Sequence, residues 1–339
     1  MLFSICIAAY NAQKYLRSSV DSVLSQSFRD YEIVIIDDGS IDGSAELCDQ
    51  LANEFPEKIR VVHNHENKGP LLSHRIFFQH ARGEWFLAVD ADDRLMDGAL
   101  ERIRSAIEKY PCDLILYDLE CIRLNGEIEK FTVPLNENHL YTGAEKKRVY
   151  EQAVQNNYIN SMCTKAIKRT IVDIDTDYTL WKELQIGEDL FQTFPILDKA
   201  EAILYLKTPL YQYIKRKDSL TNHKINNWYE QKCILWDRED DYIKKWSMGD
   251  VYSKTIVLRR IKSFVLYIDQ LFAEDSSKDD RIIILDAMRK DGRIKKWFSL
   301  AEIKSGMKLR HRIYCFCFTH GWYGLLGAFV RISQKIKQL

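Results

Sequence analysis

The sequence lacks three features that would each point to a particular class of protein. Its 49 basic and 49 acidic residues balance, so no net charge favours nucleic acid as a partner. Its eight cysteines include no Cys-x-x-Cys pair, a scatter typical of a reducing cytosol rather than of a disulfide framework. Its apolar final segment, residues 311–339, is interrupted by Thr319, His320 and glycines, so it does not predict a transmembrane helix.

The amino terminus also lacks the charged leader and small-residue cleavage site of a secretory signal, because an apolar strand begins at Leu2. We therefore expect a cytoplasmic protein. With 339 residues, of which 46% are apolar, the chain can form one catalytic domain and a smaller appended unit.

Strand and helix patterns alternate through the first hundred residues. Short apolar runs recur, and the first three are each followed by a segment with apolar residues at helical spacing. Because the runs are apolar throughout, both faces of each strand should be buried, which predicts an α/β fold with a mainly parallel sheet flanked by helices. The strands are expected at residues 2–10, 31–36, 59–64 and 84–89, and the helices at 15–28, at 41–55 and, after a loop, within 67–81.

Acidic residues directly follow two of these strands. "VIIDDGS" contains Asp37 and Asp38, and "VDADD" contains Asp90, Asp92 and Asp93, at the carboxyl ends of strands, where parallel sheets bind ligands. Two carboxylates separated by one residue suit Mg²⁺ or Mn²⁺ bound to phosphate oxygens. Acids at strand ends are also common turn formers and helix caps, so this spacing alone leaves both interpretations open.

The chain changes character further along. Another strand is expected at residues 112–123, and helices and short strands continue to residue 214, whereas the pattern from about Asn222 is helical. We therefore expect a catalytic domain at 1–221 followed by a helical carboxyl-terminal region at 222–339.

Three segments resemble the family-2 glycosyltransferases, which have the GT-A fold. "SICIAAYNAQKYLRSSVDSVLSQ", "VIIDDGSIDGS" and "NKGPLLSHRIFFQHARGEWFLAVDADD" are similar to the family's amino-terminal signature, its Asp-Asp-Gly-Ser-x-Asp element and its Asn-x-Gly…Arg…Ala-x-Gly…Asp-x-Asp element. The likeness runs from about Phe3 to Thr221. It departs at Ala8, where proline is usual, and at Ile76, where asparagine often follows the arginine.

This resemblance implies that residues 1–100 form a nucleotide-binding half with a UDP-sugar site and that residues 101–221 form an acceptor half. Ala9, Tyr10 and Asp38 would hold the uracil, because an aromatic ring can cover a base and a carboxylate can accept the imide N–H. Asp37 would support the loop, and Arg75 would lie near the nucleotide or its phosphates. Taken alone, Tyr10 could equally be a strand-end aromatic and Arg75 a solvated helix residue.

The resemblance also assigns roles within the Asp-x-Asp segment. Asp90 and Ala91 would face the ribose or nucleotide, and Asp92 would bind a divalent metal, Mn²⁺ or Mg²⁺, together with the diphosphate. Asp93 would orient the loop. A metal there neutralises the charge that grows on the departing UDP.

A general base is expected in "LQIGEDLFQTF". The family supplies its base from an acidic pair downstream of the metal ligand, which implies Asp189, with Glu188 as its neighbour. Adjacent carboxylates in a closed site raise each other's proton affinity. Without the earlier motifs, the simpler interpretation of "GED" would be a helix start, where acids are favoured.

The segment "YQYIKRKDSLTN" resembles the family's tyrosines and basic residues leading to Ser-x-Thr. By this likeness, Lys215, Arg216, Ser219 and Thr221 would close over the diphosphate, although a solvated turn is the alternative. His223 could add a metal ligand or simply lie on the surface.

Together these features predict an inverting hexosyl- or N-acetylhexosaminyltransferase. It would move a sugar from UDP to a hydroxyl of a saccharide or lipid-linked saccharide acceptor in cell-surface polysaccharide synthesis. The Gln-x-x-Arg-Trp signature of processive synthases is absent, which favours one sugar per encounter.

Two alternatives remain open at this point. A nucleotidyltransferase should carry a glycine-rich basic loop after its first strand, and "AAYNAQKY" is poor in glycine. A catalytically inactive GT-A-fold sugar-binding or scaffold protein is the other alternative. A nicotinamide dehydrogenase is disfavoured because Gly-x-Gly-x-x-Gly is absent.

The carboxyl-terminal tail is strongly basic. From Ile303 to Leu339 it contains seven lysines and arginines and no acidic residue. A helix from Trp322 would place Leu325, Phe329 and Ile332 near one face, so it could lie on an anionic membrane surface. Packing against the catalytic domain or a homodimer contact are the alternatives.

Overall fold

The computed structural model describes residues 1–155, 157–182, 184–216, 227–249, 251–273 and 277–338. They form two compact units, Met1–Tyr242 and Ile243–Leu339. The boundary expected between residues 221 and 222 lies outside the described residues. Most of the helix that follows, α8 (Trp228–Lys245), belongs to the first unit.

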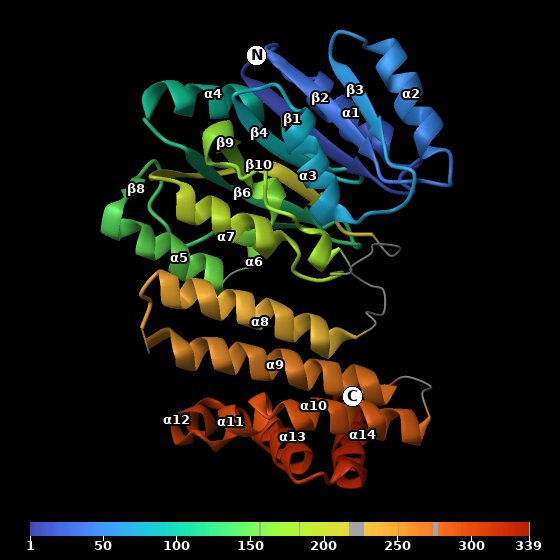
Figure 1. Cartoon of the computed structure of the whole chain (residues 1–339), viewed down its shortest axis with the longest axis vertical. Helices are drawn as coiled ribbons and strands as arrows, with labels where there is room; N and C mark the ends of the chain where they lie inside the picture. The colour runs from blue at the N-terminus through green and yellow to red at the C-terminus, as the bar shows by residue number, and fades with distance from the viewer. Residues whose placement is uncertain (156, 183, 217–226, 250, 274–276, 339) are drawn as a thin grey trace. The chain divides into compact units, whose positions relative to one another are not determined.

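A parallel half-sheet occupies the amino-terminal part of the first unit, in the strand order β3-β2-β1-β4 (Figure 1). β2 is buried at every position, as the continuous apolar run predicts for a strand covered on both faces. Connecting helices cover this half, and the alternation predicted from the sequence is confirmed. The elements are β1 (Phe3–Ala9), α1 (Leu16–Leu24), β2 (Tyr31–Asp37), α2 (Ser44–Glu54), β3 (Ile59–His63), α3 (Pro70–His80), β4 (Trp85–Asp90) and α4 (Ala99–Lys109).

The strand register brings the two acidic segments to one edge of this half-sheet. Ala9 of β1 pairs with Asp37 of β2, and Ala8 of β1 pairs with Asp90 of β4. Three parallel strands therefore end at the same level, which is where a ligand is expected in such a sheet.

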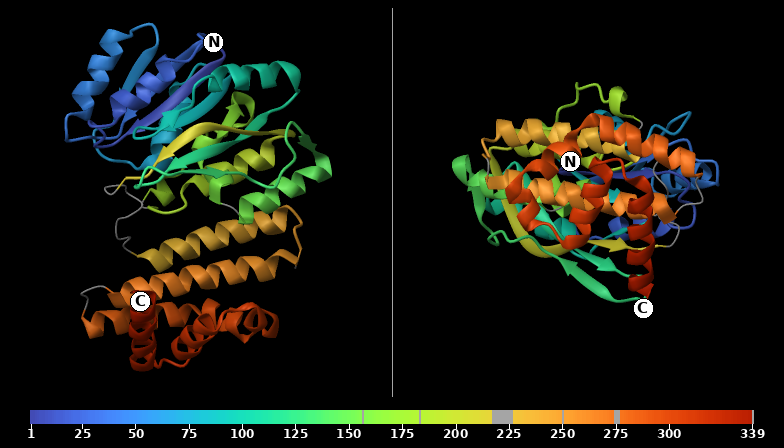
Figure 2. Two further views of the ribbon diagram at one scale, coloured as in Figure 1. Left: turned by 180° about the vertical axis from the view of Figure 1, so that it is seen from behind. Right: turned by 90° about the horizontal axis from the view of Figure 1, so that it is seen from below.

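The second half of the sheet is mixed. β9 runs antiparallel between β4 and β6, whereas β6 and β10 run parallel, side by side in the view from behind (Figure 2, left). The strands are β5 (Arg94–Leu95), β6 (Leu114–Ile122), β7 (Ile128–Phe131), β8 (Leu140–Thr142), β9 (Lys165–Lys168) and β10 (Ala202–Ile214). The helices are α5 (Lys146–Gln155), α6 (Asn157–Asn160) and α7 (Asp189–Lys199), with 3-10 turns η1 (Gly143–Glu145), η2 (Met162–Thr164), η3 (Arg169–Ile171) and η4 (Thr179–Trp181).

The second unit is helical throughout its described residues, as predicted for the carboxyl-terminal region. Its core includes Ile261, Phe264, Ile268, Leu326 and Val330, all fully buried. The helices are α9 (Val251–Ala273), α10 (Lys278–Asp291), α11 (Arg293–Ser299), α12 (Ala301–Gly306), α13 (Leu309–Thr319) and α14 (Tyr323–Gln338). Among the residues that the structure describes, none of the helices is both long enough and apolar enough to span a bilayer.

Candidate functional site

The carboxylate of Asp38 fixes the loop beside the end of β2. It accepts hydrogen bonds from the Asn64 side chain at 2.7 Å and from the backbone N–H groups of Lys68 at 3.0 Å and Gly69 at 2.8 Å. Asp38 is 4% exposed, so these donors hold a buried charge. The loop that leads into α3 is thereby fastened to the sheet edge.

The other residues expected around the uracil lie at the same edge. Asp37 accepts a hydrogen bond from the Ser40 N–H at 3.2 Å, and its second oxygen lies 2.8 Å from His63 Nδ1. These contacts support the turn after β2, as expected for Asp37. Ala9 is fully buried, whereas Tyr10 is 39% exposed and so presents its ring to solvent.

The Asp-x-Asp turn is fastened to the end of β10. Tyr211 Oη donates to Asp93 at 2.7 Å, and the Ile214 N–H donates to the other Asp93 oxygen at 2.8 Å. The Asp90 N–H in turn donates to Tyr211 Oη at 3.1 Å. Burial, reinforced by the charge of Asp90, raises the pKa of Asp93 to about 8. Asp93 thus holds the Asp-x-Asp turn against the end of β10.

Asp92 faces the segment that follows β10. Arg216 Nε lies 3.5 Å from Asp92 Oδ2, and the same guanidinium donates to the Asp92 carbonyl. It also covers the Tyr15 ring at 3.9 Å from the ring centre. Arg216 therefore lies beside the Asp-x-Asp segment, whereas the Lys215 side chain is exposed. The other residues assigned to this loop, Ser219, Thr221 and His223, lie outside the described residues.

The acidic pair expected to supply the base lies near Asp90. Burial, together with the charges of Asp189 and Asp92, raises the pKa of Asp90 to about 7. Water still reaches the Asp90 side chain, although the rest of β4 is buried. Asp90 likewise raises the pKa of Glu188, after the larger effect of burial. The structure therefore brings the end of β4 and the start of α7 into one site.

Asp189 is half-buried at the first position of α7. Burial and the neighbouring Glu188 raise its pKa to about 7, against the opposing effects of Lys165 and of the Met162 N–H that donates to its carboxylate. A carboxylate in this condition can accept a proton near neutral pH.

Two residues that the sequence did not single out, Cys163 and Lys165, complete this site together with Tyr211, a tyrosine of the segment "YQYIKRKDSLTN". The Cys163 thiol and the Tyr211 hydroxyl both form hydrogen bonds with Asp90, and the charge of Lys165 acts on Asp189. Cys163 and Lys165 belong to η2 and β9, where a short strand of four residues follows a mixed polar segment. No spacing or composition in this segment could have marked them.

Arg75 packs against the segment that precedes α7. It is 8% exposed, its guanidinium donates to the Asp173 carbonyl, and it lies 5.9 Å from the centre of the Tyr178 ring. These contacts fasten α3 to the segment before α7, and a role toward the nucleotide stays a prediction.

The donor set fits a metal that is shared with a diphosphate. Within the described part of the chain, no group of three or more His, Cys, Asp or Glu side chains could hold a metal by itself. Mg²⁺ and Mn²⁺, however, accept one or two protein carboxylates when phosphate oxygens and water complete the coordination. Asp92, with Asp90 nearby, offers that set.

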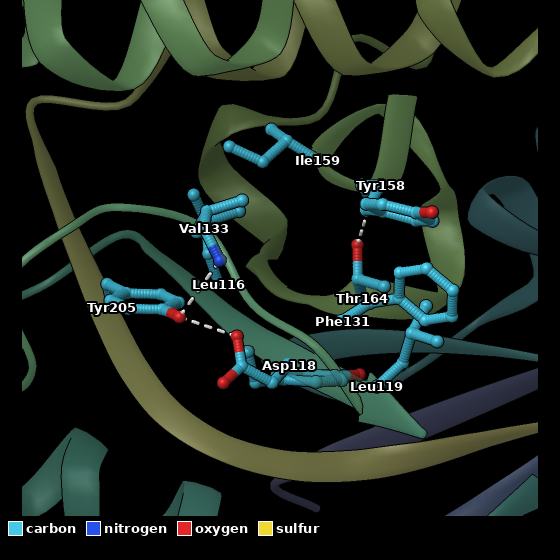
Figure 3. Close-up of a pocket in the computed structure, with 10 residues that line it drawn as sticks. Leu116, Asp118, Leu119, Phe131, Val133, Tyr158, Ile159, Thr164 and Tyr205 are labelled. Atoms are coloured by element: carbon cyan, nitrogen blue, oxygen red, sulfur yellow. Dashed lines mark hydrogen bonds between the residues drawn. The ribbon is translucent and has the colours of Figure 1, made fainter. Parts of the chain in front are cut away.

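A shallow pocket lies in the second half of the first unit, between β6 and the residues after β7 (Figure 3). On one side Tyr205 Oη donates to the Asp118 carboxylate at 2.5 Å, and on the other the Phe131 and Tyr158 rings lie 4.3 Å apart. Thr164 of η2 also lines it, so the pocket adjoins the turn that carries Cys163.

A parallel half-sheet that ends in paired acids, joined to a mixed half that contributes a second acidic pair, defines the class of glycosyltransferases with the GT-A fold. Residues 4–172 match the sequence model described as glycosyl transferase family 2. The chain belongs to this family, as its motifs predicted.

The chain is similar to several bacterial proteins of glycan synthesis. It is 24% identical over 257 residues to the putative glycosyltransferase EpsH of Bacillus subtilis, covering 75% of this chain and 72% of EpsH. The minor teichoic acid biosynthesis protein GgaA of B. subtilis is 25% identical, over 84% of this chain and 63% of GgaA. The poly(ribitol-phosphate) β-N-acetylglucosaminyltransferase TarS of Staphylococcus aureus is 25% identical, over 64% of this chain but only 36% of TarS.

A solved structure supports the fold along nearly the whole chain. The crystal structure of S. aureus TarS 1-349 in complex with UDP-GlcNAc superposes with a TM-score of 0.64 at 17% identity, covering 99% of this chain and 92% of that one. The GT-A fold with a helical carboxyl-terminal region is therefore confirmed.

Proposed function

We propose that this glycosyltransferase moves a sugar from a UDP-sugar to a hydroxyl of a saccharide or lipid-linked saccharide in cell-surface polysaccharide synthesis. The observation that carries the proposal is the electrostatic interaction between Asp90, at the end of β4, and Asp189, at the start of α7. Carboxylates of this one site can then act on both the UDP-sugar and the acceptor hydroxyl. The relatives in teichoic acid synthesis support the class of product.

Asp189 acts as the general base in this proposal. The acceptor oxygen attacks the anomeric carbon from the face opposite UDP, the bond from that carbon to the diphosphate oxygen breaks, and Asp189 takes the acceptor proton. A single displacement inverts the anomeric centre, so an α-linked donor gives a β-glycoside. The pKa of Asp189 near 7 supports this role, because the ionised form is then populated at neutral pH while proton affinity stays high.

The uracil is proposed to lie between Tyr10 and the end of β2. Asp38 Oδ2 accepts one hydrogen bond, from the Gly69 N–H, and a carboxylate oxygen has room for a second donor. The imide N–H of uracil is such a donor, which favours UDP over CDP. Asp90 and Ala91 are proposed to face the ribose.

The diphosphate is proposed to bind between Asp92 and the segment after β10. A divalent metal bound there by Asp92 would neutralise charge on the leaving UDP. Arg216 lies beside Asp92 and can donate charge-assisted hydrogen bonds to phosphate oxygens, with Lys215 next to it. Ser219, Thr221 and His223 stay part of this proposal as the rest of the loop.

Release of UDP from a panel of UDP-sugars, with Mn²⁺, with Mg²⁺ and with a chelator, tests this function. Metal-dependent release that Asp92→Ala abolishes is the expected result. Asp97→Ala is the matched control, because Asp97 is exposed and lies on the same segment. Release that proceeds equally with the chelator, or in Asp92→Ala, would contradict the metal role.

A second surface supports membrane association. Phe316, Trp322, Leu325 and Ile332 of the second unit are 42% to 55% exposed, and the Phe316 and Trp322 rings lie 5.5 Å apart. Lys308, Arg312 and Arg331 of the same unit are also exposed, and the sequence contains no acidic residue after Glu302. We propose that this face lies on anionic lipid at the inner face of the cell membrane, where lipid-linked acceptors reside. A homodimer through this face is the competing proposal.

A further inference from the structure

A buried lysine lies near the proposed general base. Lys165, the first residue of β9, is fully buried. Its ammonium donates to the Ser161 carbonyl and, at 3.4 Å, to the Asn160 carbonyl. Withdrawing an ammonium from water is costly even when carbonyl groups accept its hydrogen bonds. The two carbonyl groups are the partners that hold the Lys165 ammonium in the interior.

The segment that Lys165 holds is the one that contacts Asp189. The Met162 N–H, next to Ser161, donates to the Asp189 carboxylate. Thr193 lies one helical turn after Asp189 and donates to the Asn160 carbonyl at 2.7 Å. Lys165 on β9 therefore forms hydrogen bonds with this segment, residues 160–162, from one side. Helix α7 forms hydrogen bonds with the same segment through Asp189 and Thr193.

The charge of Lys165 also reaches Asp189. Burial lowers the pKa of Lys165 to about 8, while the nearby Asp189 opposes that shift, so the ammonium is mostly protonated at pH 7. In return it lowers the proton affinity of Asp189. The other titratable groups around this pair are Glu188 just before α7, Asp90 on β4, Cys163 on η2 and the buried His74 on α3. Burial, together with the charge of Lys165, lowers the pKa of His74 to about 4.

We propose that Lys165 is the positioning residue of the general base: it fixes the backbone that orients Asp189 and keeps the Asp189 carboxylate ionised by its charge. This rests on the proposed role of Asp189. Because Lys165 is fully buried, it acts on the reaction only through Asp189 and touches neither donor nor acceptor.

Titration of the Asp189 carboxyl carbon by NMR tests this directly in the full-length chain labelled with ¹³C at aspartate. The resonance of Asp189 is the one missing from Asp189→Asn, and its midpoint in the unmodified chain is expected near pH 7. Lys165→Met should raise the midpoint by about one unit, because a neighbouring opposite charge is lost. Lys168→Met, on the same strand but paired with Asp113 at 3.6 Å, is the matched control and should leave it unchanged.

Lys165→Gln separates the charge from the hydrogen bonds. Its neutral amide can still donate to the carbonyls, so it should fold well and raise the midpoint as Lys165→Met does. An Asp189 midpoint unchanged in both variants would overturn the proposal. If neither variant folds, Asp189→Asn gives the reciprocal measurement. Loss of the Asp189 charge should lower the pKa of Lys165 from its value of about 8, and an unchanged pKa of Lys165 would also overturn the proposal.

Kinetics then distinguish this inference from the proposed function. In a wild-type chain that releases UDP, the acidic limb of kcat against pH should move up with the NMR midpoint in Lys165→Met, lowering kcat about tenfold at pH 6 while UDP affinity is kept. A wild-type chain without transfer would contradict the proposed function and leave the NMR result to decide on Lys165.

Discussion

At the scale of single residues, the site depends on carboxylates that repel one another. Asp90 and Asp189 come from segments far apart in the sequence, and each has a pKa of about 7 in the folded chain. A cluster of negative charges is unfavourable by itself. A divalent cation that binds together with the diphosphate, beside the basic Arg216, would reduce the repulsion between these carboxylates. Burial, together with the charge of the neighbouring Glu188, raises the pKa of Asp189 and so keeps it a proton acceptor of useful strength.

Asp189→Asn should preserve UDP binding and reduce transfer by about 10²- to 10⁴-fold, because the amide is nearly isosteric but cannot take a proton. Calorimetric titration with UDP and a coupled UDP-release assay measure the two effects separately. Asp198→Asn, later in α7, is the control and should transfer normally. Near-normal transfer by Asp189→Asn would remove Asp189 from its proposed role.

The pH dependence follows from the raised pKa of Asp189. A carboxylate must be ionised to act as a base, so kcat should be maximal above pH 7 and should fall about tenfold per unit below it. A rate measured from pH 5 to pH 9 at saturating donor checks this. A plateau that extends down to pH 5 would mean that the base has an ordinary carboxylate pKa.

At the scale of elements, two loops meet tightly beside the proposed uracil site. Gly39 adopts φ +73°, and a Cβ at this position would meet the Glu66 carbonyl carbon at 2.6 Å. The turn after β2 can therefore approach the loop before α3 only with glycine. Asp38 then ties the same loop down through the Lys68 and Gly69 N–H groups.

Gly39→Ala should lower the free energy of unfolding by about 1–3 kcal/mol, because alanine disfavours positive φ and the clash falls on backbone. UDP affinity should also fall, since the loop must shift. Thermal unfolding and UDP titration measure both effects. Gly98→Ala is the control, because Gly98 has φ +72° but its added Cβ meets nothing within 4 Å, so only the backbone penalty should remain.

The sequence predicted those elements in which pattern and burial agree. β1 to β4 and α1 to α3 follow from apolar runs and helical spacing, and acids at strand ends mark one edge of the sheet. β9 was not predicted because a four-residue antiparallel strand depends on neighbours far along the chain, β4 and β6. The pairing of β9 with β4 and β6 places Lys165 and the nearby Cys163 in the site, and no local sequence pattern encodes that pairing.

At the scale of the whole molecule, the proposed catalytic site and the proposed membrane-binding face lie in different units. The first contains the acidic site, and the second contains the basic, partly apolar face around Trp322. Transfer from a soluble donor to a lipid-linked acceptor would require both the acidic site and the basic, partly apolar face.

The full-length chain should bind vesicles of phosphatidylglycerol and phosphatidylcholine more strongly than vesicles of phosphatidylcholine alone, because the tail is basic. Trp322→Ala with Leu325→Ala should weaken sedimentation with vesicles, whereas Ile283→Ala, an exposed apolar control on α10, should not. Unchanged sedimentation together with loss of a dimer in light scattering would favour the homodimer instead.

In the proposed complex, the ends of β4 and β10 and the start of α7 surround one UDP-sugar, whose diphosphate would share a divalent metal with Asp92. A crystal structure of the chain with Mn²⁺ and an unreactive UDP-sugar analogue tests it most directly. We predict metal on Asp92 and the diphosphate, Arg216 on phosphate oxygens, and the Asp189 carboxylate facing the anomeric carbon from the side opposite UDP. A diphosphate bound elsewhere, or an Asp189 carboxylate turned away from the sugar, would contradict the account.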